Sequence, residues 1–353
     1  ASDVYKRQSW NGCRRWTDPQ GPLSRKTAAR LSRAVPLFKF FGSIQLSRQV
    51  PLVFLGGLDY TVKLKTPERR CYMESVKIGS VGLGRLGYEH AKNLAASIPG
   101  CVLHAICNVD TSRLRAVAEE LGVPHTYTDF AAMCADPELD GIVIVSPSFL
   151  HVEQIKIAME HGKHVAVEVP AAMSLDECWQ LVDTAEKTQR HCMMLENCCY
   201  DFFEMTTLNM AREGLFGEIV HVEGAYIHDL RELQFDRRHG YVDMWRLEHN
   251  ALHTGNPYPT HGLGPLCQLL DIHRGDRMER LVSLSSDQFG MSAYATAKYG
   301  AESAEAERPY ALGDMNTTLI RTARGKSILI QHDITSPRPY NRCLLYTSPS
   351  PRD

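Results

Sequence analysis

The chain has 353 residues, of which 44% are hydrophobic and 23% charged, as in an ordinary globular protein with room for two cores. Its net charge of −2 is uneven, because residues 1–72 carry 14 basic and 4 acidic side chains and the remainder carries 25 and 37. An acidic body is unsuited to a phosphate backbone, and no apolar stretch approaches the ~20 residues of a membrane span, so we expect neither a nucleic-acid nor a membrane partner.

The two ends of the chain differ from the rest. Residues 1–72 mix Pro, Arg and Ser with short apolar stretches that show no helix or strand period, and we interpret them as non-native or disordered sequence ahead of a start at Met73. A transit peptide is the alternative for this basic leader. The tail from Cys343 to Asp353 has the character of translated adapter sequence. The localisation, cytoplasmic or exported, therefore stays open.

Eleven cysteines are scattered along the chain, and most of them stand in apolar runs. None forms a Cys-x-x-Cys pair, which is the spacing of zinc ribbons. We therefore expect reduced thiols that pack as small hydrophobic groups, and no metal site.

A glycine-rich turn follows the first regular strand. The apolar strand Val76–Val81 runs directly into Gly82-Leu83-Gly84-Arg85-Leu86-Gly87, and a helix is predicted over Tyr88–Ser97. In this order the first glycine permits a tight turn, the second lets a pyrophosphate approach the backbone, and the third lets the helix pack on the strand. The turn predicts a dinucleotide site, and a glycine turn without a ligand is the alternative.

A second strand, Val102–Cys107, ends in Asn108-Val109-Asp110. A residue that binds the ribose hydroxyls is expected here, about 20 residues after the turn. Asn108 occupies that position and Asp110 lies two residues on, so both are predicted to contact the cofactor. An asparagine can bond a ribose hydroxyl but repels a 2′-phosphate less than a carboxylate would, and NAD remains the preferred cofactor over NADP.

Strands and helices continue to alternate up to Asn197. The predicted elements are the helix Thr111–Leu121, the strand Gly141–Val145, the helix Val152–His161, the strand His164–Val167, a helix with a capping box at Ser174 and Glu177, and the strand Cys192–Leu195. Such alternation is typical of a doubly wound, parallel Rossmann sheet, which binds ligands beyond the carboxyl ends of its strands. We assign this domain to residues 73–197. Its strand ends add six predicted cofactor contacts: Ser146, Pro147, His151, Glu168, Val169 and Asn197.

The pattern after Asn197 is that of an α+β domain, assigned to residues 198–342. Its predicted elements are the helix Tyr200–Arg212, the strand Glu218–Ile227, a helix from His261 to about Ile272, the strand Arg280–Ser286, and the hairpin of Thr317–Thr322 and Ser327–His332, turned at Arg324-Gly325. We expect an open sheet with a helix on one face. The other face would serve as a substrate wall or an oligomer interface.

The glycine turn, Ser146-Pro147 with His151, Glu168-x-Pro170 and a late Thr260-His261 occur in an order that resembles the Gfo/Idh/MocA family. The resemblance covers about residues 73–342 and implies a Rossmann domain with an open-sheet substrate domain, mostly in sugar or inositol dehydrogenases. Ordinary members carry a Lys beside the reacting hydroxyl and an Asp four residues before the catalytic His. Val169 and Pro257 stand at these positions, so a simple dehydrogenase would lack two of its three polar catalytic groups.

A narrower resemblance accommodates these departures. The segments Val165–Ala172, Leu195–Asp201, Tyr258–Pro265 and Pro337–Asn341 look like glycoside hydrolase family 109, whose characterised activity is that of an NAD-dependent α-N-acetylgalactosaminidase. Upstream, residues 82–151 are more similar to an inositol-type dehydrogenase, and Ser148-Phe149-Leu150 stand where the family usually has a Trp-containing segment. A divergent lineage and a chimera joined near residues 151–163 are the two explanations.

The resemblance implies a redox route to glycosidic cleavage, which is an exception to the usual pair of carboxylates. Carbon 3 of the sugar is oxidised by NAD, and the resulting ketone acidifies the proton on carbon 2. A base removes this proton and the glycosidic oxygen leaves by elimination. Water then adds, the proton returns, and carbon 3 is reduced again. Because the cofactor ends unchanged, it is expected to stay tightly bound.

The same resemblance assigns catalytic roles to five residues. His261 and Tyr258 match positions beside the carbon 3 hydroxyl, with His261 as the proton acceptor. Tyr226 matches a base or proton donor near carbon 2, although a tyrosine is a weak base unless a neighbour lowers its pKa. Glu196 would polarise a hydroxyl or water, with a ribose or backbone bond as the alternative. Tyr340 matches a further catalytic position.

Substrate binding is expected from Tyr226, Tyr258 and His261, together with Arg246 and Asn256. For the last two, a place in a solvated loop is the alternative. For His261 it is a purely structural bond at a helix start, and for Tyr226 it is packing within a strand.

Three functions follow, in order of preference. The first is a glycosidase that uses tightly bound NAD and removes terminal α-N-acetylgalactosamine from a small sugar or a glycan. The second is an NAD(P)-dependent sugar or inositol dehydrogenase with altered catalytic groups. The third is an inactive, truncated or chimeric cofactor-binding protein. Open-sheet domains of the resembled family often pair sheet to sheet, so a homodimer is possible.

Overall fold

The computed structural model describes residues 75–96, 98–241 and 244–347. All described residues belong to one compact unit of the chain. The predicted leader, residues 1–72, lies outside the described residues, as do residues 348–353 of the predicted tail.

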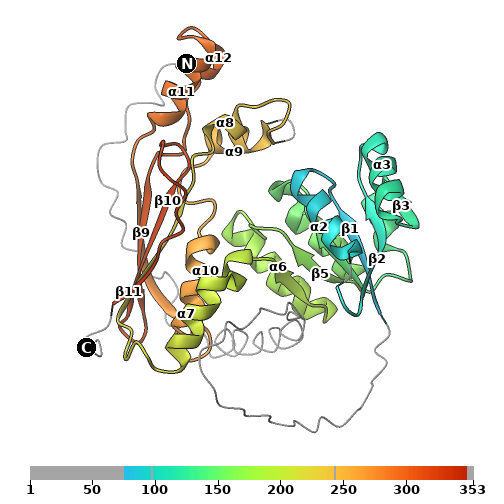
Figure 1. The fold of residues 1–353 in the computed structure, drawn as a ribbon, viewed down its shortest axis with the longest axis horizontal. Coiled ribbons are helices and arrows are strands. Elements are labelled where there is room, and N and C mark those ends of the chain that lie inside the picture. The colour runs from blue at the N-terminus through green and yellow to red at the C-terminus, as the bar shows by residue number, and fades with distance from the viewer. Residues whose placement is uncertain (1–74, 97, 242–243, 348–353) are drawn as a thin grey trace, which may run out of the picture. The chain divides into compact units, whose positions relative to one another are not determined.

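Six parallel strands form the first sheet, in the order β3-β2-β1-β4-β5-β6 (Figure 1). This order confirms the predicted doubly wound Rossmann sheet. From β1 the chain first adds strands on one side, β2 and β3, and then crosses over to add β4, β5 and β6 on the other side. The strands are β1 (Val76–Val81), β2 (Cys101–Cys107), β3 (His125–Tyr127), β4 (Gly141–Ile144), β5 (His164–Val167) and β6 (Cys192–Met194). Only β3, which is three residues long, was not predicted.

Helices cover both faces of this sheet. They are α2 (Arg85–Ala95), α3 (Thr111–Leu121), α4 (Phe130–Cys134), η3 (Ser148–Leu150), α5 (His151–Glu160) and α6 (Leu175–Thr188). Ile106 of β2 packs in the hydrophobic cluster of α2 and α3, whereas its neighbours Ala105 and Cys107 pack in the cluster of α4 and α5. Because side chains alternate across a strand, the two sets of helices lie on opposite faces.

Some helix limits agree with the sequence-based prediction, and others differ from it by one to three residues. The limits of α3 are those predicted, with Asp110 as its cap, and the capping box of Ser174 and Glu177 begins α6. The helix predicted from Tyr88 instead begins at Arg85. The third glycine of the turn therefore belongs to the first turn of α2, which is where close packing on the strand requires it.

Five strands form the second sheet, in the order β11-β7-β10-β9-β8. β7 and β10 run parallel and the other neighbours antiparallel. The strands are β7 (His221–Ile227), β8 (Met278–Ser285), β9 (Asn316–Thr322), β10 (Ser327–Asp333) and β11 (Leu344–Thr347). The predicted α+β open sheet is confirmed, although β7 begins three residues later than predicted.

The helices of this part of the chain are η4 (Asn197–Tyr200), α7 (Phe202–Arg212), α8 (Arg231–Gln234), α9 (Trp245–Leu252), α10 (Thr260–Leu269), α11 (Gly290–Tyr299) and α12 (Ala304–Glu307). Leu266 and Leu270 pack α10 onto the sheet through Val222 and Ile328. A Cβ atom on Gly262 would lie 2.7 Å from the backbone nitrogen of Ala225. The missing side chain therefore lets the start of α10 lie directly against β7.

Part of the predicted tail is ordered into the second sheet. β11 falls inside residues 343–353, which the sequence analysis interprets as adapter-derived, and it pairs antiparallel with β7. Its origin stays a prediction, as do the domain limits at residues 73, 197 and 342. No helix of the described residues is long and apolar enough to cross a membrane.

Candidate active site

The glycine turn has the shape that a dinucleotide requires. Gly82 has a φ of +86°, and a Cβ on it would lie 2.7 Å from the carbonyl oxygen of Val145. A Cβ on Gly87 would lie 1.7 Å from the carbonyl oxygen of Gly82, whereas one on Gly84 would have no atom within 4 Å. Gly84 is also the N-cap of α2 and offers no capping side chain, so the first N–H groups of the helix are available to an anion. The turn therefore fits a pyrophosphate.

The other residues of the turn differ in exposure. Leu83 is 1% exposed and belongs to the core beneath α2 and α3, while Arg85 and Leu86 are exposed in the first turn of α2. The structure therefore leaves Arg85 and Leu86, but not the side chain of Leu83, open to a bound molecule.

The two residues predicted to contact ribose also hold the turn and the next helix. The Asn108 side-chain oxygen accepts a hydrogen bond from the Leu83 N–H at 3.2 Å. Asp110 accepts hydrogen bonds from the N–H groups of Ser112 and Arg113 at 2.9 and 3.0 Å and so caps α3. Arg113, which the sequence analysis did not single out, donates from Nε to the Leu83 carbonyl oxygen at 3.1 Å. The ribose contacts of Asn108 and Asp110 stay a prediction.

His151 joins the carboxyl ends of β4 and β5. It is 1% exposed, and its two ring nitrogens lie 2.8 Å from the carbonyl oxygens of Ser146 and Pro170. Burial lowers the pKa of His151, although its contacts with these two carbonyl oxygens act in the opposite direction. In this structure His151 thus fixes the two segments at which cofactor contacts are predicted, one of which contains Pro147 as the residue before η3.

The segment after β5 is held in a similar way. Glu168 lies 2.9 Å from the ring nitrogen Nε2 of His90 in α2 and accepts a hydrogen bond from the Val169 N–H at 2.9 Å. Val169 is 7% exposed and packs with Tyr226 and Tyr258. The residue that replaces the usual lysine therefore contributes an apolar surface beside two predicted catalytic tyrosines.

Four of the predicted catalytic residues form one aromatic cluster: Tyr226, Tyr258, His261 and Tyr340. Tyr226 is its centre, with ring centroids 4.9 Å from His261, 5.8 Å from Tyr258 and 6.5 Å from Tyr340. Tyr258 and His261 stack at 5.7 Å, as expected for residues three apart at the start of α10. Residues that are up to 114 positions apart in the sequence are thus in one place.

Glu196 supplies the carboxylate that orients the imidazole of His261. Its Oε1 lies 2.8 Å from Nδ1 of His261 and accepts a hydrogen bond from the Cys198 N–H at 3.1 Å. A proton on Nδ1 would leave the lone pair on Nε2, the form that can accept a proton from a substrate. The orienting group that Pro257 cannot provide therefore comes from a residue 65 positions before His261.

The charge state of Glu196 supports this arrangement. Burial acts to raise the pKa of Glu196, but the hydrogen bonds from His261 and the Cys198 N–H help to outweigh it, and the pKa lies below its ordinary value. Glu196 is therefore a carboxylate at neutral pH although it is 5% exposed. The predicted backbone bond is present as well, since Cys198 donates to the same oxygen.

Glu196, Cys198 and His261 are also close enough to share a metal ion. Cys198 Sγ lies 3.3 Å from Nδ1 of His261. Cys198 belongs to the short helix η4, whose first residue is Asn197, a predicted cofactor contact. Burial, followed by the nearby Glu196, raises the pKa of the Cys198 thiol well above its ordinary value. Because the Glu196 carboxylate already faces Nδ1 of His261 at 2.8 Å, we assign these groups to the placement of His261.

Tyr226 is placed to donate a proton rather than to accept one. Burial raises its pKa to about 12, and Arg246 offsets this effect only in part. Its hydroxyl oxygen lies 3.1 Å from Nδ1 of His228. Burial and the positive charge of Arg246 lower the pKa of His228, so its ring is neutral and can accept this hydrogen bond. The base role of Tyr226 therefore requires that its own proton moves to His228.

Arg246 and Asn256 lie beside Tyr258. Arg246 is 7% exposed in α9, and its guanidinium carbon lies 4.2 Å from the centroid of the Tyr258 ring, so the alternative of a solvated loop is wrong for this residue. The Asn256 side-chain oxygen accepts a hydrogen bond from the Tyr258 N–H at 2.9 Å. Nε of Arg246 and Nδ2 of Asn256 are buried donors without a hydrogen-bond partner among the described residues, and both are free to bind a ligand.

Sequence reasoning missed His228 and His332. His332 lies opposite Tyr226 in the pairing of β7 with β10, with ring centroids 6.0 Å apart, and it is 1% exposed. Neither of its ring nitrogens has a hydrogen-bond partner among the described residues. Both histidines stand at the carboxyl end of a strand in the parallel pair β7 and β10. Ligands bind beyond the carboxyl ends of parallel strands, and this rule would have identified both histidines if the parallel pairing of β7 and β10 had been predicted.

The burial of His332 predicts a pH-dependent stability. Burial lowers the pKa of His332 to about 3 from the ordinary value of 6.5, so the unfolded chain binds the proton more readily than the folded one. The free energy of unfolding should be independent of this group above pH 6.5 and fall as the pH drops towards 3. Between pH 7 and pH 5, the free energy of unfolding should fall by about 2 kcal/mol more in the wild-type protein than in the His332→Phe variant, as measured by urea unfolding.

His239 serves as the control for this measurement, because its side chain is 83% exposed. The variant His239→Phe should follow the wild-type dependence on pH. Equal losses of stability in wild-type and His332→Phe protein would show that His332 does not titrate as described.

Two family models match consecutive parts of the chain. Residues 76–196 match the oxidoreductase family with an NAD-binding Rossmann fold, and residues 200–347 match the C-terminal domain of glycosyl hydrolase 109. The fold and the glycine turn therefore define a Gfo/Idh/MocA-type protein with an NAD-binding domain, which confirms the predicted cofactor.

Similar proteins narrow this class. The chain is 52% identical over 277 residues to an α-N-acetylgalactosaminidase of Bacteroides fragilis, a match that covers 76% of this chain and 65% of the relative. It is 51% identical to glycosyl hydrolase family 109 protein 2 of Phocaeicola vulgatus, of which it covers 67%. The chain belongs to glycosyl hydrolase family 109. It spans about two thirds of the length of these relatives.

Solved structures share the fold. A scyllo-inositol dehydrogenase of Lactobacillus casei has a TM-score of 0.59 at 19% identity, with 78% of this chain and 76% of that chain covered. An NAD-binding oxidoreductase of Klebsiella pneumoniae has a TM-score of 0.60 at 21% identity, with 75% and 68% covered.

The extent of the match with the relatives bears on the suggested chimera. A match to 76% of the chain must run through residues 151–163, because neither side of that segment is long enough to hold it alone. One relative thus aligns with the chain on both sides of the suggested junction, and the choice between a divergent lineage and a chimera stays a prediction.

Proposed function

We propose that this protein is a glycosidase that uses NAD to remove terminal α-N-acetylgalactosamine from a sugar or glycan. The observation that carries the proposal is the imidazole of His261, held by the Glu196 carboxylate at 2.8 Å inside a cluster of tyrosines. The relative from Bacteroides fragilis, named as an α-N-acetylgalactosaminidase, supports the choice of sugar.

The cofactor and His261 would act together at carbon 3. NAD, held by the turn from Gly82 to Gly87, supplies hydride transfer from and back to this carbon. His261 accepts the proton of the carbon 3 hydroxyl through Nε2, and Glu196 stabilises the imidazolium that forms. When carbon 3 is reduced again, the same imidazolium returns the proton. Arg246 and Asn256 are buried donors beside this site and would hold the sugar hydroxyls or its acetamido group.

Tyr226 and His228 would act at carbon 2. Because the pKa of Tyr226 is about 12, its phenolate is not available at neutral pH. The phenol oxygen can take the proton from carbon 2 only as its own proton passes to Nδ1 of His228, 3.1 Å away. The reverse transfer then returns a proton to carbon 2 after water has added. Tyr340, whose ring lies 4.7 Å from that of His228, closes this side of the cluster.

A single experiment tests this function. The full chain is incubated with an aryl α-N-acetylgalactosaminide in heavy water, without added NAD. Release of the aryl group together with a sugar that carries deuterium at carbon 2 is the expected result, because carbon 2 is deprotonated before water adds. Aryl release without deuterium would contradict the elimination step.

The same preparation separates the alternatives. Net formation of NADH from free sugars or inositols, with no aryl release, would indicate the dehydrogenase and overturn the glycosidase. If the protein binds NAD but shows no activity in either assay, the inactive cofactor-binding protein is the favoured alternative.

We also propose that two copies associate through the second sheet. On one face of β8, Val282 and Leu284 are 64% and 76% exposed, which leaves an apolar patch at the edge of the sheet. Light scattering of the chain in solution decides between one copy and two.

A further inference from the structure

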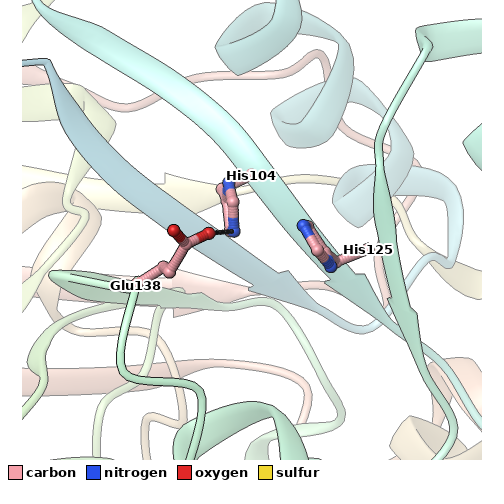
Figure 2. A group of neighbouring side chains, drawn as sticks. All are labelled: His104, His125 and Glu138. Atoms are coloured by element: carbon pink, nitrogen blue, oxygen red, sulfur yellow. Dashed lines mark ion pairs between the residues drawn. The ribbon is translucent and has the colours of Figure 1, made fainter.

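A second group of ligand-type side chains lies in the Rossmann domain, on strands that the redox site does not use. It consists of His104 in β2, His125 at the start of β3 and Glu138 in the segment between α4 and β4 (Figure 2). One nitrogen or oxygen from each of the three lies within 4.8 Å of the others. The two imidazole rings are 4.4 Å apart, and Figure 2 shows the carboxylate facing His104 beside them.

The spacing of these atoms is compatible with a cation held between them. Nε2 of His104 lies 3.1 Å from Oε2 of Glu138. Two ligands that each lie about 2.0–2.1 Å from a tetrahedral ion are roughly 3.3 Å from each other. The observed distance is therefore close to one edge of a tetrahedral coordination shell.

An unpaired buried nitrogen provides independent support. His104 is 7% exposed, and its Nε2 has no hydrogen-bond partner among the described residues, although the Glu138 carboxylate is near. The pair therefore lacks the alignment of a hydrogen bond, and a buried nitrogen without a partner is unfavourable. A cation between the two groups would satisfy both.

The surroundings of the group are acidic and fixed. Oδ2 of Asp136 lies 3.9 Å from Nε2 of His104, and Tyr127 donates a hydrogen bond to the same oxygen at 3.0 Å. The Glu138 N–H donates to Oδ1 of Asp136 at 2.9 Å, which holds the loop in place. Glu138 has a positive neighbour in Lys77, whose ammonium lies 3.3 Å from Oε1 and whose side chain is 39% exposed. Lys77 can turn into solvent and free the carboxylate.

We propose that His104, His125 and Glu138 bind a divalent transition-metal ion. Two imidazoles and a carboxylate are a donor set that Zn²⁺ accepts readily and that Mg²⁺ and Ca²⁺, which prefer oxygen ligands, do not. Water or Asp136 completes the shell. The ion would tie β3, which pairs with β2 over three residues, to the segment that carries Glu138. Its role is to hold the β3 edge of the Rossmann sheet.

This site differs from what the cysteine pattern suggested. The expectation of no metal site rests on the spacing of cysteines, and that spacing carries no information about histidines on separate strands. The three ligands are 21 and 13 residues apart; the pairing of β2 with β3 brings the two histidines together, and Glu138 reaches them from the segment between α4 and β4.

The test is a titration of the full chain, freed of metal by a chelator, with Zn²⁺ in a calorimeter and with Co²⁺ in a spectrometer. One tight site is expected, together with a higher melting temperature on Zn²⁺ addition and a visible Co²⁺ band of low-symmetry coordination. Replacement of groups that merely orient ligands costs about 10–100-fold in metal affinity, so loss of a ligand in His125→Gln or Glu138→Gln should cost at least as much. His125 is exposed, so its replacement should not disturb folding.

A matched control uses another pair of histidines whose rings stack closely. His249 and His253 stack at 4.3 Å on α9 and belong to no group of three ligand-type side chains among the described residues. The double variant His249→Gln, His253→Gln should bind Zn²⁺ as wild type does. Conversely, Lys77→Gln removes the competing cation and should tighten binding. Two results would overturn the proposal: a loss of Zn²⁺ affinity in the control variant but not in His125→Gln, or the absence of saturable Zn²⁺ binding by the wild-type protein. Neither result bears on the glycosidase assay.

Discussion

Replacement of His261 by Gln should slow glycosidic cleavage by about 10²–10⁴-fold and leave NAD binding and the melting temperature close to wild type. A glutamine amide can still donate to the Glu196 carboxylate but cannot accept and return a proton. The measurement is kcat for an aryl α-N-acetylgalactosaminide, with bound NAD determined from the absorbance of the purified protein. A loss in kcat without a loss of cofactor would assign the effect to the proton transfer.

Glu196→Gln examines the same pair from the other side. The amide can present its N–H to Nδ1 of His261 and so favour the wrong tautomer, in which Nε2 carries the proton. A neutral partner also no longer stabilises the imidazolium, and kcat should fall by a comparable factor. The control is His239→Gln, whose side chain is 83% exposed and should leave kcat unchanged. Retention of more than about a third of wild-type kcat in His261→Gln would contradict its role as the proton acceptor.

The glycine turn predicts opposite results for its second and third glycines. Gly87→Ala should destabilise the fold by more than about 3 kcal/mol, because the new Cβ would lie 1.7 Å from the Gly82 carbonyl oxygen and backbone would have to move. Gly84→Ala has no atom within 4 Å of the new Cβ, so the fold should keep its stability. The added methyl group would stand where the pyrophosphate approaches, and NAD should bind at least tenfold more weakly, a loss of about 1.4 kcal/mol.

Two measurements on each variant decide this pair. Urea unfolding gives the free energy of unfolding. Calorimetric titration gives the affinity for NAD, after the cofactor has been removed from the purified protein. Wild-type NAD affinity in Gly84→Ala would mean that the cofactor does not lie against this turn. Wild-type stability in Gly87→Ala would mean that α2 does not pack on β1 as closely as described.

Local patterns were sufficient for most of the fold. The limits of β1, β5 and α3 and the capping box at Ser174 could be read from apolar runs, caps and glycines, because each of these signals lies within a few residues of the element it defines. The short strand β3 could not, since three residues are too few to show a period. The start of α2 was placed too late, because its first turn is specified by the packing of Gly87 on the backbone of Gly82.

The residues of the candidate site could also be named from the sequence, but their relations could not. Motifs around Glu196, Tyr226, Tyr258 and His261 pointed to them singly, and the structure places them within one cluster. Arg246 was a weak candidate on sequence, because nothing local distinguishes a buried arginine on a short helix from one in a loop.

By itself, the sequence determined that this protein has a Rossmann domain with a dinucleotide turn and a second domain of glycosyl hydrolase family 109. It did so because strand–helix alternation and motif order are properties of neighbouring residues. Only the tertiary structure decided that Glu196 orients His261, that burial keeps Tyr226 protonated, and that His104, His125 and Glu138 meet. Those relations depend on burial and on contacts between residues far apart along the chain, and neither is set until the two sheets have formed.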